Sequence, residues 1–111
     1  MEIDDLTIGE AKELAQMFGN KEYDDNPYKV GKNYFIRTVT MALVGTLKSV
    51  GRQELVLEDA AWVADTGRFG DFLRDGDADE VEPFPNGEVF VGRGAIIDVV
   101  EWKHKPLRKQ K

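Results

Sequence analysis

Hydrophobic residues near the start of the chain recur every three or four positions, the spacing of one face of an α-helix. The stripe consists of Ile8, Ala11, Leu14, Ala15 and Phe18. Thr7 and Glu10 before it form a capping box, in which Thr7 accepts from the backbone N–H of Glu10 and Glu10 reaches back. Gly19 and Asn20 supply a left-handed stop. The pattern predicts an amphipathic helix over residues 6–19 that packs over an open end of the core.

From residue 33 the hydrophobic period becomes two, which is typical of β-strands. Alternate positions place one set of side chains on each face: Tyr34, Ile36, Thr38, Thr40 and Ala42 against Phe35, Arg37, Val39 and Met41. This run is too long for one straight strand, and Gly45 allows the sharp bend that a small barrel requires. Gly51 marks a tight turn within residues 49–52, followed by a third strand. Residues 33–60 are therefore predicted to form strands one to three.

The segment 61–87 interrupts the succession of strands. Asp65 or Thr66 is positioned to cap a short helix whose apolar face is Phe69, Phe72 and Leu73. An acidic loop over residues 75–87 ends in the turn Pro85-Asn86-Gly87. Residues 88–102 then predict strands four and five, with Arg93-Gly94 between them. The expected fold is mainly β with an N-terminal helix: a small bent five-stranded antiparallel barrel with a helix-containing insertion between strands three and four.

Composition narrows the class of protein. The chain has 111 residues, which fits a single domain over residues 1–111, and it has no cysteine, which excludes disulfides, cysteine zinc sites and thiol nucleophiles. The acidic start and the lack of a long apolar run predict neither a signal peptide nor a membrane span, and a cytoplasmic location is expected. The net charge of −6 disfavours broad nucleic-acid binding. Residues 103–111 are basic, and such a tail is more often a solvated terminus than a binding arm.

Two stretches resemble the motifs of the Sm-like family, which comprises Sm and LSm proteins and bacterial Hfq. The first is Val44-Gly45-Thr46-Leu47 followed by residues 55–60, LVLEDA; the family has Gly-x-Leu in a bent second strand and a similar third strand. The second is residues 89–97, VFVGRGAII, which matches a family motif of apolar residues, Arg-Gly and then Ile. The order of helix and strands also matches. The long segment 61–87 is similar to small Sm-like proteins of phages, for which the location would be the bacterial host cytoplasm.

Some family features are absent. The Asn that holds a uridine in Sm and LSm proteins has no counterpart in the turn Val50-Gly51-Arg52-Gln53-Glu54, which is shorter by a residue. Gly92 precedes Arg93-Gly94, and Ala95 replaces a small polar residue. The Lys-His pair typical of the bacterial members lies at 103–104, beyond the last predicted strand.

The resemblance implies a homo-oligomeric ring of five to seven subunits, in which the fourth strand of one subunit pairs with the fifth of the next. It also implies that the two turns converge on a pore, where a ligand-binding set would lie: Arg52, Gln53, Arg93 and Gly94. Arginine pairs with phosphate and stacks on bases, so RNA or another nucleotide ligand is the leading hypothesis. The alternatives are a sponge that sequesters a small cyclic nucleotide, as a phage counter-defence protein would, and a structural ring without a nucleotide ligand.

No activated nucleophile, acid–base pair or metal set is predicted, so the protein is expected to be neither an enzyme nor a cofactor carrier. The acidic run from Asp75 resembles a calcium loop, but Glu80 and Asn86 occupy positions that calcium loops give to Gly and Glu. His104 has no predicted partner, and an ion pair of Arg93 with Glu58 or Asp59 competes with a ligand-binding role for that arginine. Trp62 and Phe69 more often fill a core than stack on bases.

Overall fold

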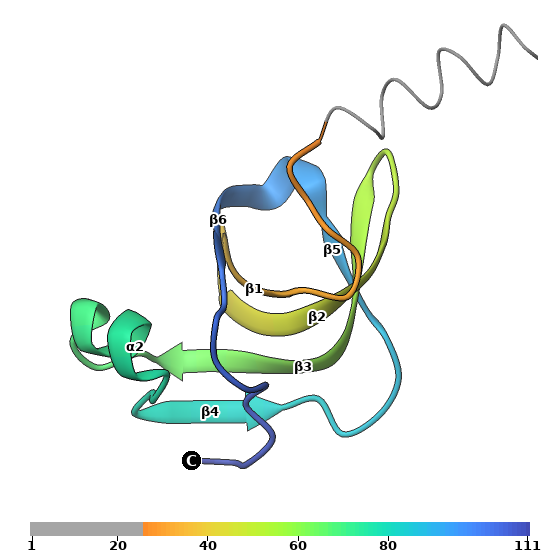
Figure 1. Ribbon diagram of the computed structural model, residues 1–111. Helices are drawn as coiled ribbons and strands as arrows, with labels where there is room; N and C mark the ends of the chain where they lie inside the picture. The colour runs from red at the N-terminus through yellow and green to blue at the C-terminus, as the bar shows by residue number, and fades with distance from the viewer. Residues whose placement is uncertain (1–25) are drawn as a thin grey trace, which may run out of the picture.

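The computed structural model describes residues 26–111, and the predicted helix over residues 6–19 lies outside them. The described part is mainly β and antiparallel, with one α-helix, which confirms the predicted fold class at that level. Its elements are β1 (Asn33–Thr38), β2 (Ala42–Val50), β3 (Glu54–Asp65), α2 (Phe69–Asp75), β4 (Glu80–Pro83), β5 (Val89–Gly92), the short 3-10 helix η2 (Arg93–Ala95) and β6 (Ile96–Glu101). Figure 1 shows the strands curled into a barrel-like arrangement, with α2 and β4 to one side.

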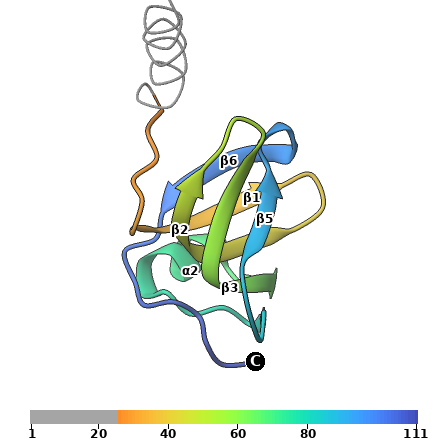
Figure 2. The same ribbon diagram turned by 90° about the vertical axis from the view of Figure 1, so that its right-hand side faces the viewer.

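The sheet has six strands in place of the five predicted, in the order β4-β3-β2-β1-β6, with β5 also paired to β3. The additional strand β4 forms in the stretch expected to be an acidic loop. It forms because β3 continues to Asp65, beyond the predicted limit at residue 60, and offers residues 61–65 as a partner. The first half of β3 pairs with β5, from Glu54 opposite Gly92 to Leu57 opposite Val89. β4 and β5 therefore pair with successive halves of the long strand β3. Figure 2 shows β5 beside β3.

Alternate residues of β1 supply two separate cores. The inner core lies inside the curled sheet and contains Tyr34, Ile36, Leu43, Leu47, Leu55, Leu57, Ala60 and Val91. The outer core lies between the sheet, α2, β4 and the C-terminal segment and contains Phe35, Val44, Ala61, Val63, Phe72, Ala78, Val81 and Trp102. The period of two predicted here is therefore observed, with both faces buried. Trp62 and Phe69, expected in a core, are each 39% exposed.

The bend of the sheet is produced at Gly45 and Asp59. The β2–β3 register shifts between Val44 and Thr46, around the glycine at which a bend was predicted. A Cβ on Gly45 would lie 3.0 Å from the Cβ of Ala60, so a larger residue would force the two strands to shift apart by a few tenths of an ångström. Asp59 has a left-handed φ of 53°, uncommon outside glycine. Its carboxylate accepts from Arg108 Nε at 2.9 Å, which ties the bend to the C-terminal segment.

The helix α2 begins later than its sequence cap predicted. Its N-cap is Arg68, which makes no side-chain capping bond. Asp65 instead accepts from the backbone N–H of Gly67 at 2.8 Å, and the Thr66 hydroxyl donates to the Gly67 carbonyl. Both candidate caps are thus used in the turn before the helix, so the predicted capping role is wrong.

Most residues of the C-terminal segment are exposed, as expected for a solvated terminus, but the segment is also bonded to the domain. Lys111 and Val81 exchange two backbone hydrogen bonds of 2.9 and 3.0 Å, so the segment covers the outer edge of β4. Lys111 pairs with Asp77, and Gln110 donates to Glu82. The His104 ring lies 4.9 Å from that of Trp102, and its Nε2 is 2.8 Å from the Leu73 carbonyl. Residues of the acidic stretch 75–82 thus bond to the end of the C-terminal segment.

The pairing of β1 with β6 includes an ion pair whose contribution to stability should depend on pH. Arg37 and Asp98 lie opposite each other, and the guanidinium holds the pKa of the Asp98 carboxyl below its usual value, mainly through the hydrogen bond. Because the Asp98 carboxyl has a lower pKa in the folded protein than in the unfolded one, its ion pair stabilises the fold at pH values above the unfolded pKa. This contribution is lost as the pH falls through the folded pKa. We expect Asp98→Asn to lower the Tm at pH 7. The difference from the unmodified protein should shrink below about pH 4 and vanish once the pH is below the folded pKa.

Because both side chains are exposed, this Tm difference should be small and should shrink with added salt. Thermal unfolding followed by circular dichroism between pH 2.5 and 7 measures it. A difference that persists unchanged at pH 2.5 would show that the substitution acts through packing and not through charge.

Candidate nucleotide-binding end of the barrel

The turn between β2 and β3 and the connection from β5 to β6 lie together at one end of the barrel, as Figures 1 and 2 show. The backbone N–H of Arg93 donates to the Gln53 carbonyl at 2.7 Å. The Arg93 side chain continues across the same junction, and its Nη1 donates to the Gly51 carbonyl at 2.8 Å. Gly51 is itself fixed, because its N–H donates to the Glu54 carbonyl at 2.8 Å and closes the predicted tight turn. The backbone thus places one arginine at the meeting point of two turns.

The other predicted site residues lie around this junction. Arg52 and Gln53 are exposed at the tip of the first turn, and Gly94 is exposed in η2. Open space surrounds Gly94, and its φ does not require glycine, so the protomer itself does not demand this residue. The competing ion pair is not formed, because Arg93 bonds to Gly51 and Asp59 bonds to Arg108.

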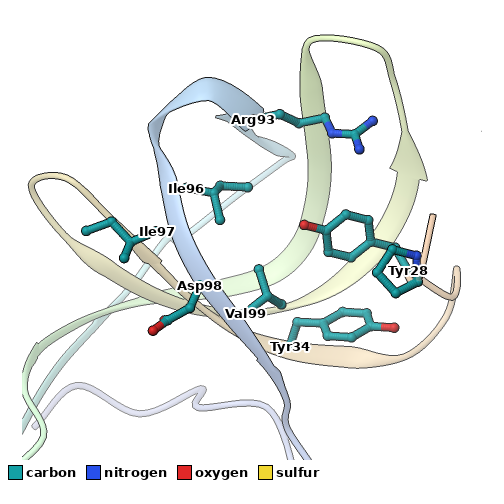
Figure 3. Close-up of a pocket in the computed structure, with 8 residues that line it drawn as sticks. Tyr28, Tyr34, Arg93, Ile96, Ile97, Asp98 and Val99 are labelled. Carbon is teal, nitrogen blue, oxygen red and sulfur yellow. The ribbon is translucent and has the colours of Figure 1, made fainter. Parts of the chain in front are cut away.

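A cavity of about 460 Å³ lies beside Arg93, and no pattern in the sequence indicates it directly. Its lining is formed by Pro27, Tyr28, Tyr34, Arg93, Ile96, Ile97, Asp98 and Val99. Figure 3 shows Tyr28, Tyr34, Ile96 and Val99 around one space, with the Arg93 side chain reaching over it. This volume falls within the usual range for small-molecule sites.

The aromatic part of the cavity is held in place by its own contacts. The Tyr28 and Tyr34 rings meet edge to face, with centroids 5.9 Å apart. The Arg93 guanidinium carbon lies 5.7 Å from the Tyr28 ring centroid, within the range of a cation–π contact. The Tyr34 hydroxyl accepts from the Lys29 backbone N–H at 2.8 Å, which leaves its own proton able to donate. The site therefore combines aromatic surface, a cation and a hydroxyl donor.

Sequence reasoning missed Tyr28 and Tyr34 as site residues for different reasons. Tyr28 stands in a polar, turn-rich segment whose path no local pattern predicts. The alternation places Tyr34 on a strand face, but its nearness to Arg93 depends on the pairing of β1 with β6, which are distant in sequence. An aromatic residue directly after Asn26-Pro27 is the signal that could have pointed to Tyr28.

Two strands of the sheet have an open edge in the described part of the chain: β5 pairs with β3 alone, and β6 pairs with β1 alone. Exposed apolar side chains accompany both edges. Phe90 on β5 is 68% exposed, and Ile97 on β6 is 65% exposed. Open edges with apolar side chains favour pairing with another chain.

The remaining candidate chemistry is sparse. Over residues 26–111, no three His, Asp or Glu side chains are grouped closely enough to hold a metal ion. Within the same residues, no helix has the length and apolar character to cross a membrane.

Comparison with known proteins gives few matches. No family model matches the chain, and no curated protein matches it. The crystal structure of a heptameric archaeal Sm protein, described with implications for the eukaryotic snRNP core, aligns with 75% of this chain and 97% of its own. The identity is 20% and the TM-score is 0.46.

Proposed function

We propose that this protein is a non-catalytic ring-forming protein that binds single-stranded RNA through the junction of its two turns. The observation that carries the proposal is the pair of open edges, β5 and β6, which lie on either side of Arg93 in the chain. A contact between two different edges of identical subunits repeats from one subunit to the next and closes into a ring when the rotation allows. The sequence motifs of the Sm-like type support five to seven subunits.

Within residues 26–111, β5 and β6 each have one edge without a partner strand, as such an assembly needs, whereas the outer edge of β4 is covered. The outer edge of β4 is already occupied by Lys111, which exchanges two hydrogen bonds with Val81. The charges along β6 are also balanced, because Asp98 pairs with Arg37 and Glu101 with Lys32. A neighbouring β5 can therefore approach β6 without meeting unpaired carboxylates, and pairing would bury Phe90 and Ile97.

The same assembly would repeat Arg52 and Arg93 once per subunit. Several arginines at one end of a ring make a positive surface on a protein whose net charge is −6. Arginine binds phosphate in a bidentate manner and stacks on bases, which suits a single strand.

Arg93→Ala should weaken binding of oligo(U) and oligo(A) about tenfold or more. It should also lower the salt slope of the binding constant by about 0.7 for each phosphate that an arginine no longer neutralises. Fluorescence anisotropy at two salt concentrations measures both. Arg74→Ala is the matched control, because Arg74 is exposed on α2, bonded to Asp71 and Asp75, away from the turns. Equal effects of the two substitutions would refute the role of the junction.

Native mass spectrometry of the protein purified from cells tests the ligand class directly. We expect a ring that carries oligonucleotide. A ring carrying one discrete small nucleotide mass would favour the sponge, and a ring with no nucleotide at any concentration would favour a structural role. A protomer mass alone would contradict the ring.

A further inference from the structure

We infer that the cavity beside Arg93 is a nucleobase pocket, which accepts the base of a nucleotide while Arg93 holds the phosphate. A base and its phosphate are the parts of the ligand that one protomer would bind. That this nucleotide belongs to an RNA strand rests on the proposed function. All eight lining residues belong to one protomer, so the pocket exists before any assembly. A free mononucleotide is thus sufficient as a ligand.

The walls of the pocket fit a flat aromatic ligand. Tyr28 and Tyr34 supply aromatic surface, and Ile96 and Val99 supply aliphatic surface around the same space (Figure 3). Tyr28 is half-buried, while Tyr34 is 7% exposed and belongs to the inner core. Stacking of a base on an aromatic side chain is tolerant of base identity, because every base has a π-face. The pocket should therefore bind purine and pyrimidine nucleotides, with the larger purine gaining more contact.

The polar groups of the pocket fit the remainder of a nucleotide. The Arg93 side chain has five N–H donors, and within residues 26–111 it gives one of them to the Gly51 carbonyl. The other donors can bind a phosphate at the rim of the cavity. The Tyr34 hydroxyl, already accepting from Lys29, offers its proton to an acceptor on the base or sugar. The Asp98 carboxylate is bonded to Arg37, so it does not present an unpaired negative charge to the phosphate.

A titration with AMP, UMP, adenosine and ribose 5-phosphate, followed by methyl NMR of the full chain, tests the pocket. We expect AMP and UMP to shift the methyl signals of Ile96, Ile97 and Val99, while Val63 and Val81 in the outer core stay unchanged. Ribose 5-phosphate should bind at least tenfold more weakly than AMP, because it lacks the base. Equal affinity for the two would overturn the inference, because it would show an anion site only.

Substitution of Tyr28 distinguishes stacking from general disruption. Tyr28→Ala and Tyr28→Leu should each weaken AMP binding about tenfold, and Tyr28→Phe should retain it, because the ring and not the hydroxyl makes the contact. Leucine keeps apolar volume without the aromatic face, so a loss of affinity in both variants identifies stacking. Unchanged binding by both variants would overturn the inference.

The outcomes for the pocket and for the ring are separable. Phe90→Lys alters an edge strand that contributes no lining residue, so it should keep AMP binding even if it yields protomers. A protein that remains a protomer but binds AMP would support the pocket and contradict the ring. A ring that binds RNA while no pocket methyl moves would overturn the pocket and leave the proposed function standing.

Discussion

Phe90→Lys is expected to convert the proposed ring to protomers of 12.5 kDa at micromolar concentration. Phe90 is 68% exposed on the open edge strand β5, where an aromatic side chain would be an anchor of the subunit contact. A lysine there places a charge in the contact and opposes edge pairing. Loss of an anchor residue costs about 2 kcal/mol or more at each interface, and a ring repeats the loss at every interface. Light scattering coupled to gel filtration measures the mass.

Val30→Lys is the matched control for this experiment. Val30 is also an exposed apolar residue, at 65%, but it precedes β1 and belongs to neither edge strand. Its variant should keep the mass of the unmodified protein. An oligomer that survives Phe90→Lys, or an unmodified protein that is a protomer, would show that β5 is not the contact.

Phe72→Ala is expected to lower the free energy of unfolding by about 3–5 kcal/mol. Phe72 is fully buried, and its ring centroid lies 5.0 Å from that of Phe35 and 4.8 Å from that of Trp102. Its removal leaves a cavity between α2, β1 and the segment after β6, so the loss of stability should be global and not confined to the insertion. Urea unfolding followed by tryptophan fluorescence measures it, because Trp102 reports from the same cluster.

Phe69→Ala is the comparison within the same helix. Phe69 is 39% exposed and lies on the margin of the cluster, 5.9 Å from the Phe35 ring. Less buried apolar surface is removed there, so this variant should cost clearly less stability. Equal losses of stability would mean that α2 contributes through its helical structure and not through the burial of Phe72.

The two cores explain why the insertion belongs to the fold. The barrel interior alone would leave Phe35 and Trp102 uncovered, because they lie on the opposite face of the sheet from Ile36. α2, β4 and the C-terminal segment cover that face and place Phe72 between the two rings. Arg93 and its cavity are not part of this outer core, because none of the residues that line the cavity belongs to it.

The elements with local signals could be predicted from the sequence. The alternation around Phe35, the turn at Gly51, the bend at Gly45 and the break at Arg93 each depend on neighbours within a few residues. Side-chain alternation and glycine sterics act over that range, so a pattern is sufficient to reveal them. Sequence patterns also place Arg93 and Gln53 in turns, and the structure joins those turns by a backbone hydrogen bond.

Tertiary structure decided the features that depend on partners distant in the chain. Glu80–Pro83 became a strand because an extended β3 was available to pair, and the basic C-terminal residues were bound because Asp59, Asp77 and Val81 lay within reach. Tyr28, near the start of the described residues, likewise contacts Arg93 only because the fold brings the two side chains together. A single strand edge or exposed charge has no preferred partner until the chain folds, because pairing energy depends on distance in space and not on separation in sequence. Composition therefore identified the charges and the aromatic residues, while the folded backbone determined which of them meet.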